Sequence, residues 1–220
     1  MTGPGRTSRR LRFSGRIAGF GTASGTRIVL GLWESTPFGA FADAMVERAD
    51  GHRLLIAPTD EVAEFIGSTY SFDEVRLAPV AWHRVAGGIE ATAGPLSLAL
   101  RLGGLTLLGR LLRIVPRPLA EHPAWLTAIS PVASVLVRGV STAGSAGHGR
   151  REYYGVRAIR SILGVTASLD GADLGALGPL SPPVRFGFSS APATPAIVDV
   201  TTTITLPRTP GAARERGSAS

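Results

Sequence analysis

The sequence predicts an α+β domain: a curved, mostly antiparallel sheet or partial β-barrel of about nine strands, with two to four short helices covering one end. Three observations predict it. Segments in which apolar and polar side chains alternate recur along the chain. The 28 glycines and 16 prolines supply many turns. Short helical patterns stand between groups of strands. Two stacked sheets with helices over an open end are the alternative arrangement.

The length of 220 residues suits a single core, and no interior linker divides the chain. We expect one domain over residues 10–206. Residues 1–9 and 207–220 are mixtures of Gly, Pro, Ser and Arg that cannot bury a core, and we expect two disordered tails, the first of them basic.

Two hairpins are predicted in the first quarter of the domain. Leu11, Phe13 and Ile17 share one face of a strand over residues 10–19, and residues 27–33 return after a glycine-rich turn. Residues 41–48 and 52–58 form the second hairpin, because Asp50 and Gly51 between them favour a tight reversal. Thr59 then caps a short helix over residues 60–69.

The middle of the chain begins with an extended segment over residues 73–85, interrupted by Pro79, and continues with residues 89–94. Residues 96–116 are rich in leucine. Up to Leu102 they alternate as a strand, and after Gly103 and Gly104 the spacing becomes that of an amphipathic helix ending at Pro116. This change of period is incompatible with one membrane-spanning helix. We expect this segment to form one wall of any pocket.

The remaining elements follow from the same patterns. Residues 121–129 and 130–137 are expected to be short helical pieces, and residues 139–152 a flexible basic loop. Strands are predicted over residues 153–169, 184–188 and 196–206.

Composition excludes several kinds of chemistry. All 23 basic residues are arginine, and the chain has no lysine and no cysteine. Lysine Schiff bases, a phosphate-loop lysine, thiol nucleophiles and thiolate metal sites are therefore excluded. The four histidines are far apart and show no metal-ligand spacing. We expect no metal and no cofactor.

Net charge of +7 suggests attraction to polyanions, but six of the arginines lie in or beside the tails. The excess charge of the folded body is correspondingly smaller, which argues against nucleic acid as a partner. Contact with an anionic membrane surface stays open, because Arg110 and Arg113 lie on the polar side of the predicted helix.

The clearest polar cluster lies between His148 and Arg160, where arginines stand beside two tyrosines. Arginine recognises carboxylates in two-point fashion, and tyrosine adds flat apolar area and a hydroxyl. Tryptophans elsewhere could line the same concave site. The candidate ligand-binding residues are Arg150, Arg151, Tyr153, Tyr154, Arg157, Trp33 and Trp82.

A catalytic alternative uses histidine and carboxylate groups as general acid and base. The candidates are His83 and His148, paired with Asp43, Glu47 or Glu90. These groups would have to converge in one cleft. Catalysis is otherwise undecided by the sequence.

The stretches "GTRIVLGLWESTPFGAFADAMVERADGHRLLIAP" and "PPVRFGF" are similar to conserved hypothetical proteins of GC-rich bacteria. These have no assigned activity, so the resemblance implies a folded family and no catalytic residues. In architecture, the predicted curved sheet with helices resembles the acetoacetate-decarboxylase-like barrels. Those use a lysine Schiff base, which a lysine-free chain cannot form.

Three functional hypotheses follow. The first is a cytoplasmic domain that binds a small, mostly apolar ligand, with or without a carboxylate. The second is an enzyme that works by histidine and carboxylate chemistry. The third is a module that binds an anionic membrane surface or nucleic acid through arginines. The oligomeric state does not follow from the sequence.

Overall fold

The computed structural model describes residues 10–116, 122, 124, 126, 143–146, 150–187 and 192–205, without the side chains of 143–146 and 150–152. The predicted tails lie outside this part of the chain, as do most of the predicted helical pieces over 121–129 and 130–137.

Within the described residues, the chain forms thirteen strands and two helices. In order they are β1 (Arg10–Thr22), β2 (Arg27–Ser35), β3 (Phe41–Glu47), β4 (Arg53–Ala57), α1 (Asp60–Gly67), β5 (Glu74–Leu77), β6 (Val80–Val85), β7 (Gly88–Ala93), β8 (Leu96–Leu105), α2 (Leu107–Leu112), β9 (Ala143–Ala146), β10 (Arg150–Leu169), β11 (Ala172–Asp173), β12 (Leu177–Gly178) and β13 (Ala196–Thr205).

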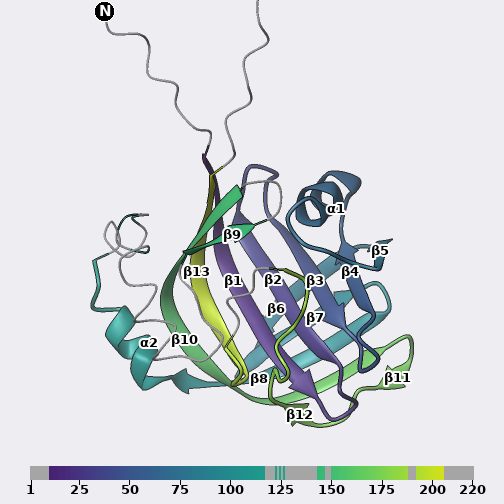
Figure 1. Ribbon diagram of the computed structural model, residues 1–220. Helices are drawn as coiled ribbons and strands as arrows, with labels where there is room; N and C mark the ends of the chain where they lie inside the picture. The colour runs from purple at the N-terminus through teal and green to yellow at the C-terminus, as the bar shows by residue number, and fades with distance from the viewer. Residues whose placement is uncertain are drawn as a thin grey trace, which may run out of the picture.

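One sheet contains all the strands, and the predicted curved, mostly antiparallel architecture is confirmed. Ten strands follow the order β5-β4-β3-β2-β1-β13-β10-β8-β7-β6, and β9, β11 and β12 pair with its members. The pairing of β4 with β5 is parallel. The sheet curls so strongly that β6 comes within 8 Å of β3 between Cα atoms. Figure 1 shows β6, β7 and β8 behind β1, β2 and β3.

The strand count exceeds the predicted nine for local reasons. Pro79 divides the extended segment 73–85 into two strands, β5 and β6, that lie at opposite ends of the sheet order. The predicted loop over 139–152 contains β9, which pairs with the start of β10. The glycine-rich turns after β10 contain the two-residue strands β11 and β12.

Gly103 and Gly104 do not end the leucine-rich strand, which corrects the prediction. β8 continues to Leu105, and its pairing with β10 shifts register twice in this region. Such shifts are typical of β-bulges, which a glycine inside a strand often marks. The side chain of Leu163 lies over Gly103. α2 begins only after Thr106, whose hydroxyl accepts a hydrogen bond from the Gly109 amide.

The inner face of the curled sheet encloses the main core. Alternating residues of β1 to β4 meet residues of β7, β8, β10 and β13 across it. Its fully buried large side chains include Phe20, Ile28, Leu30, Leu32, Leu54, Ile56 and Leu96.

The outer face of β1 to β4 is covered as well, by α1 and by residues 180–186. Leu55 packs against Val62, Ala63 and Ile66 of α1. Burial on both faces explains the nearly continuous apolar runs of β2 and β4. The two helices do not cover one common end of the sheet, which corrects the prediction, because α1 packs on β4 and α2 on β10.

Residues 184–188 were predicted to be a strand, and residues 184–187 do not form one. Pro182 and Pro183 lack the amide hydrogens that a strand would donate. The neighbouring backbone groups bond elsewhere: the Arg185 amide donates to Glu47 (2.7 Å), and the Phe186 carbonyl accepts from the Ser71 amide (2.6 Å). Val184 and Phe186 instead pack against Val29 on the outer face of the sheet.

Candidate functional site

A cavity of about 100 Å³ lies between the outer face of the sheet and its covering elements. β1, β2, β3, β10 and β13 supply the floor, and α1, Tyr70 and residues 184–186 supply parts of the walls. For comparison, an apolar protein cavity of about 150 Å³ binds benzene. The cavity is smaller than this but partly open to solvent, so it can hold an apolar group whose far end reaches the surface.

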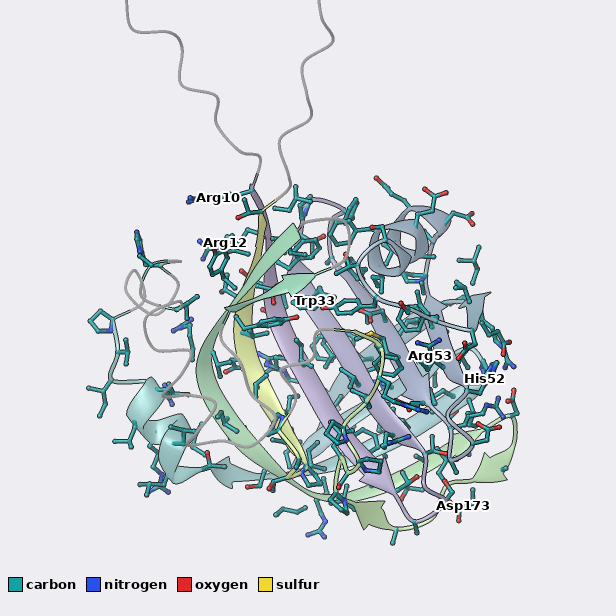
Figure 2. The ribbon with its side chains drawn as sticks, viewed as in Figure 1. Arg10, Arg12, Trp33, His52, Arg53 and Asp173 are labelled. Carbon is teal, nitrogen blue, oxygen red and sulfur yellow. The ribbon has the colours of Figure 1, made fainter. Side chains whose placement is uncertain are left out.

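An aromatic cluster forms one wall and holds α1 against the sheet. Phe13 of β1 stacks on Phe65 of α1, with ring centroids 5.1 Å apart, and meets Trp33 edge-on at 5.8 Å. Phe38 and Phe41 complete the cluster. Trp33 is labelled in Figure 2. Of these five rings, those of Phe13, Trp33, Phe41 and Phe65 line the cavity, so this wall is mostly apolar.

Asp43 is a buried carboxyl group on the lining of the cavity. Its side chain is 3% exposed, and its Oδ1 accepts a hydrogen bond from Trp33 Nε1 at 2.9 Å. Burial raises the pKa of Asp43 to about 6, and the hydrogen bond from Trp33 partly opposes this rise.

Gly31 makes the Asp43–Trp33 contact sterically feasible. It lies opposite Asp43 in the pairing of β2 with β3. A Cβ atom at Gly31 would be 2.4 Å from Asp43 Oδ1 and 2.6 Å from Trp33 Nε1. Any side chain at this position would therefore displace the pair.

Two tyrosines meet beside the cavity. The hydroxyl oxygens of Tyr70, which follows α1, and Tyr154, on β10, are 2.9 Å apart. Thr202 of β13 faces Tyr154 across the strand pair, and its buried hydroxyl has no hydrogen-bond partner within the described part of the chain. These groups add polar atoms to a lining that is otherwise mostly apolar.

The structure brings some of the sequence candidates to this cavity. Trp33, Tyr154 and Asp43 line it. Tyr153 and Arg157 are half-buried on β10 and do not line it, and Trp82 packs against the inner core. The side chains of Arg150 and Arg151, and all of His148, lie outside the described residues. The proposed ligand contacts of these arginines stay predictions.

His83 and Glu90 do come together, as cross-strand neighbours on β6 and β7. His83 Nε2 lies 3.1 Å from a Glu90 carboxylate oxygen. Both side chains are exposed, and they line a separate hollow together with residues of β8 and β10. Glu47 is buried in an ion pair with Arg27. The candidate catalytic groups that the structure describes therefore lie at three separate places.

The cavity contains residues that the sequence interpretation did not select. Tyr70, Thr202, Phe13 and Phe65 are on elements far apart in the chain, so no local spacing marks them. A usable signal was Gly31 inside the apolar run of β2, because an interior strand glycine often marks a close approach. The leucine-rich segment 96–116 does not line this cavity, although Ser97, Leu98 and Ala99 line the hollow that contains His83.

α2 and the turn that follows it present apolar side chains to solvent. Leu107 and Ile114 are 75% and 76% exposed, and Leu111 lies between them at helical spacing. Arg110 and Arg113 are exposed beside them. The segment from residue 91 to residue 120 contains no Asp or Glu.

Comparison of the chain with protein families, with curated proteins and with solved structures finds no match. Among the described residues, no helix has the length and hydropathy to cross a membrane, and no group of three or more His, Asp or Glu side chains could hold a metal ion.

Proposed function

We propose that the protein binds a small, mostly apolar ligand in the cavity between α1 and the outer face of the sheet. The observation that supports this is an apolar cavity of about 100 Å³ whose lining includes a buried carboxyl group, Asp43. Apolar cavities with a few convergent polar groups and perturbed pKa values are typical of ligand sites.

The proposal is tested by filling the cavity. Val198 of β13 lines it and is half-buried, so Val198→Phe would place a ring in the ligand space. Small apolar probes such as hexanol, cyclohexanol and toluene are titrated into the wild type and the variant, followed by ¹⁵N–¹H NMR. We expect binding to the wild type with shifts at Trp33 and Tyr154, and at least a tenfold weaker affinity in Val198→Phe.

Val75→Phe is the matched control, because it makes the same substitution at an exposed position of β5. Its affinity is expected to equal that of the wild type. If no probe binds the wild type, or if Val198→Phe binds as tightly as Val75→Phe, the proposal is wrong.

A second candidate function is contact of α2 with an anionic membrane surface. It is supported by the exposed Leu107, Leu111 and Ile114, by the adjacent arginines, and by the absence of acidic residues from residue 91 to residue 120. Apolar side chains enter the lipid boundary while arginines attract anionic headgroups.

Sedimentation with vesicles tests this second function. We expect binding to vesicles that contain phosphatidylserine and little binding to pure phosphatidylcholine. Leu107→Ser with Leu111→Ser should reduce binding at least fivefold, while Val75→Ser and Leu77→Ser, at exposed positions of β5, should not. Equal binding of both variants, or binding to duplex DNA but not to vesicles, would exclude the membrane surface.

A further inference from the structure

The carboxyl group of Asp43 has unused hydrogen-bonding capacity. A carboxylate has about four acceptor positions, and the described structure gives Asp43 one donor, the indole of Trp33. No arginine or histidine of the described chain forms an ion pair with Asp43. A buried carboxylate without a charged partner is costly, so a donor that enters the cavity gains a strong interaction there.

The other polar atoms of the described lining belong to neutral side chains. The tyrosine hydroxyls contact each other, and the remaining side-chain oxygens belong to Thr69 and Thr202. No arginine or histidine lines the cavity among the described residues. Against the described lining, an anionic group would meet the Asp43 carboxylate with no cation to offset the repulsion, whereas a hydrogen-bond donor or a cation would be stabilised.

We propose that the polar end of the cavity ligand is a hydrogen-bond donor received by Asp43, and that a protonated primary amine on a short apolar body is the preferred form. This inference rests on the proposed function and specifies its ligand class. The apolar body lies against the aromatic wall. A carboxylate-bearing ligand, which the sequence suggested through its arginine cluster, is the competing chemistry.

The preference predicts a characteristic pH dependence. Because burial raises the pKa of Asp43 to about 6, the carboxyl is largely protonated at pH 5 and largely ionised at pH 7.5. An amine with a pKa near that of lysine stays protonated throughout this range. Amine affinity should therefore rise from pH 5 to pH 7.5, while the affinity of a neutral alcohol should change little.

Three probes with one apolar body separate the alternatives: hexylamine, 1-hexanol and hexanoate, titrated into the full chain by calorimetry at pH 5.0 and pH 7.5. At pH 7.5 we expect hexylamine to bind at least tenfold more tightly than hexanoate, with 1-hexanol between them. The ¹⁵N–¹H resonance of the Trp33 indole, assigned through Trp33→Phe, should shift on titration, since Trp33 donates to the same carboxylate.

Asp43→Asn keeps the shape of the side chain and removes its charge. We expect it to lower hexylamine affinity at least tenfold at pH 7.5 and to change 1-hexanol affinity less than threefold. Glu61→Gln, which removes an exposed carboxylate of α1, is the matched control and should leave all three affinities unchanged.

The outcomes separate the two proposals. If none of the three probes binds and cyclohexanol and toluene do not bind either, the proposed function fails and the inference with it. If cyclohexanol or toluene binds and the three hexyl probes do not, the inference alone fails. If 1-hexanol or hexanoate binds in the cavity but hexylamine binds no better than hexanoate, the ligand class is wrong and the proposed function stands. A hexylamine affinity that Asp43→Asn leaves intact also overturns the inference.

Discussion

A single glycine permits the polar feature of the cavity. The carboxyl group of Asp43 faces apolar side chains on the outer face of the sheet. Because Gly31 has no side chain, the Trp33 indole can reach this carboxyl group and donate a hydrogen bond to it. The single hydrogen bond from Trp33 does not offset the loss of hydration that burial imposes on the carboxylate, so the pKa of Asp43 remains raised. At neutral pH the ionised Asp43 therefore lowers the free energy of unfolding of the ligand-free protein.

Asp43→Asn should stabilise the protein at neutral pH. Well below pH 3.8 the Asp43 carboxyl is protonated in both the folded and the unfolded protein. As the pH rises, the unfolded protein loses this proton near pH 3.8 and the folded protein near pH 6. Stability from this group is therefore present at low pH and lost with rising pH. A shift from 3.8 to about 6 corresponds to about 3 kcal/mol.

Urea unfolding at pH 4, 5, 6, 7 and 8 measures this. The stability difference between Asp43→Asn and wild type should grow by about 2–3 kcal/mol between pH 4 and pH 7. Glu61→Gln should show no such trend. A difference that is constant across this range would contradict the raised pKa.

At the scale of elements, a buried ion pair fixes the segment over residues 180–186 to the sheet. Glu47 is 0% exposed. Its carboxylate oxygens lie 3.0 Å from Arg27 Nη2, and they accept hydrogen bonds from Arg185 Nε at 2.9 Å and from the Arg185 amide at 2.7 Å. Arg27 also donates to the Pro182 carbonyl at 2.9 Å. The segment therefore covers the cavity without belonging to the strand ladder.

Glu47→Ala should destabilise the fold by about 3–5 kcal/mol, because it leaves the Arg27 guanidinium buried without its partner. Arg185→Ala removes a side chain that is 68% exposed, and it should cost less than about 1 kcal/mol. Chemical denaturation measures both, and hydrogen exchange at Phe186 reports on the segment. Equal losses in the two variants would show that burial of Glu47 is not the cause.

At the scale of the whole molecule, charged side chains connect distant parts of the curled sheet. Asp170, in the turn between β10 and β11, lies 2.8 Å from Arg48 Nη2 after β3 and 2.8 Å from Arg76 Nη1 on β5. Arg76 also pairs with Glu74, which lies 3.0 Å from His52. Figure 2 shows His52 and Arg53 at this side of the molecule.

Asp170→Asn should weaken this connection without straining the turn. Asp170 has a φ of 52°, a conformation that asparagine tolerates well. The loss should be at most about 1 kcal/mol per exposed ion pair and should shrink in high salt. The arginines lower the pKa of Asp170, so its contribution is present at neutral pH and is lost as pH falls below its usual value.

Thermal unfolding at low and high salt tests this prediction. Asp173→Asn, on the same hairpin, retains an oxygen for the Gly175 amide and serves as the control. A salt-independent loss for Asp170→Asn would point to the turn rather than to the ion pairs.

Local periodicity was sufficient to predict the first four strands, the Thr59 cap of α1 and the alternation along β13. These features depend on neighbours within a few residues. Gly103 and Gly104 were misinterpreted because a glycine pair at a β-bulge resembles a strand end in sequence. Residues 184–187 were misinterpreted because an apolar run bounded by turns resembles a strand when its hydrogen-bond partners are unknown.

The sequence by itself predicted a mostly antiparallel sheet and excluded lysine and cysteine chemistry, because both follow from composition and local pattern. The tertiary structure showed that the strands form one curled sheet and not two stacked ones. Only the tertiary structure decided where the cavity lies and that Asp43, Trp33 and Tyr154 share it. These residues are on three strands, and Tyr70 reaches them from the end of α1. Their convergence depends on strand order and register, which a single sequence does not encode in any local spacing.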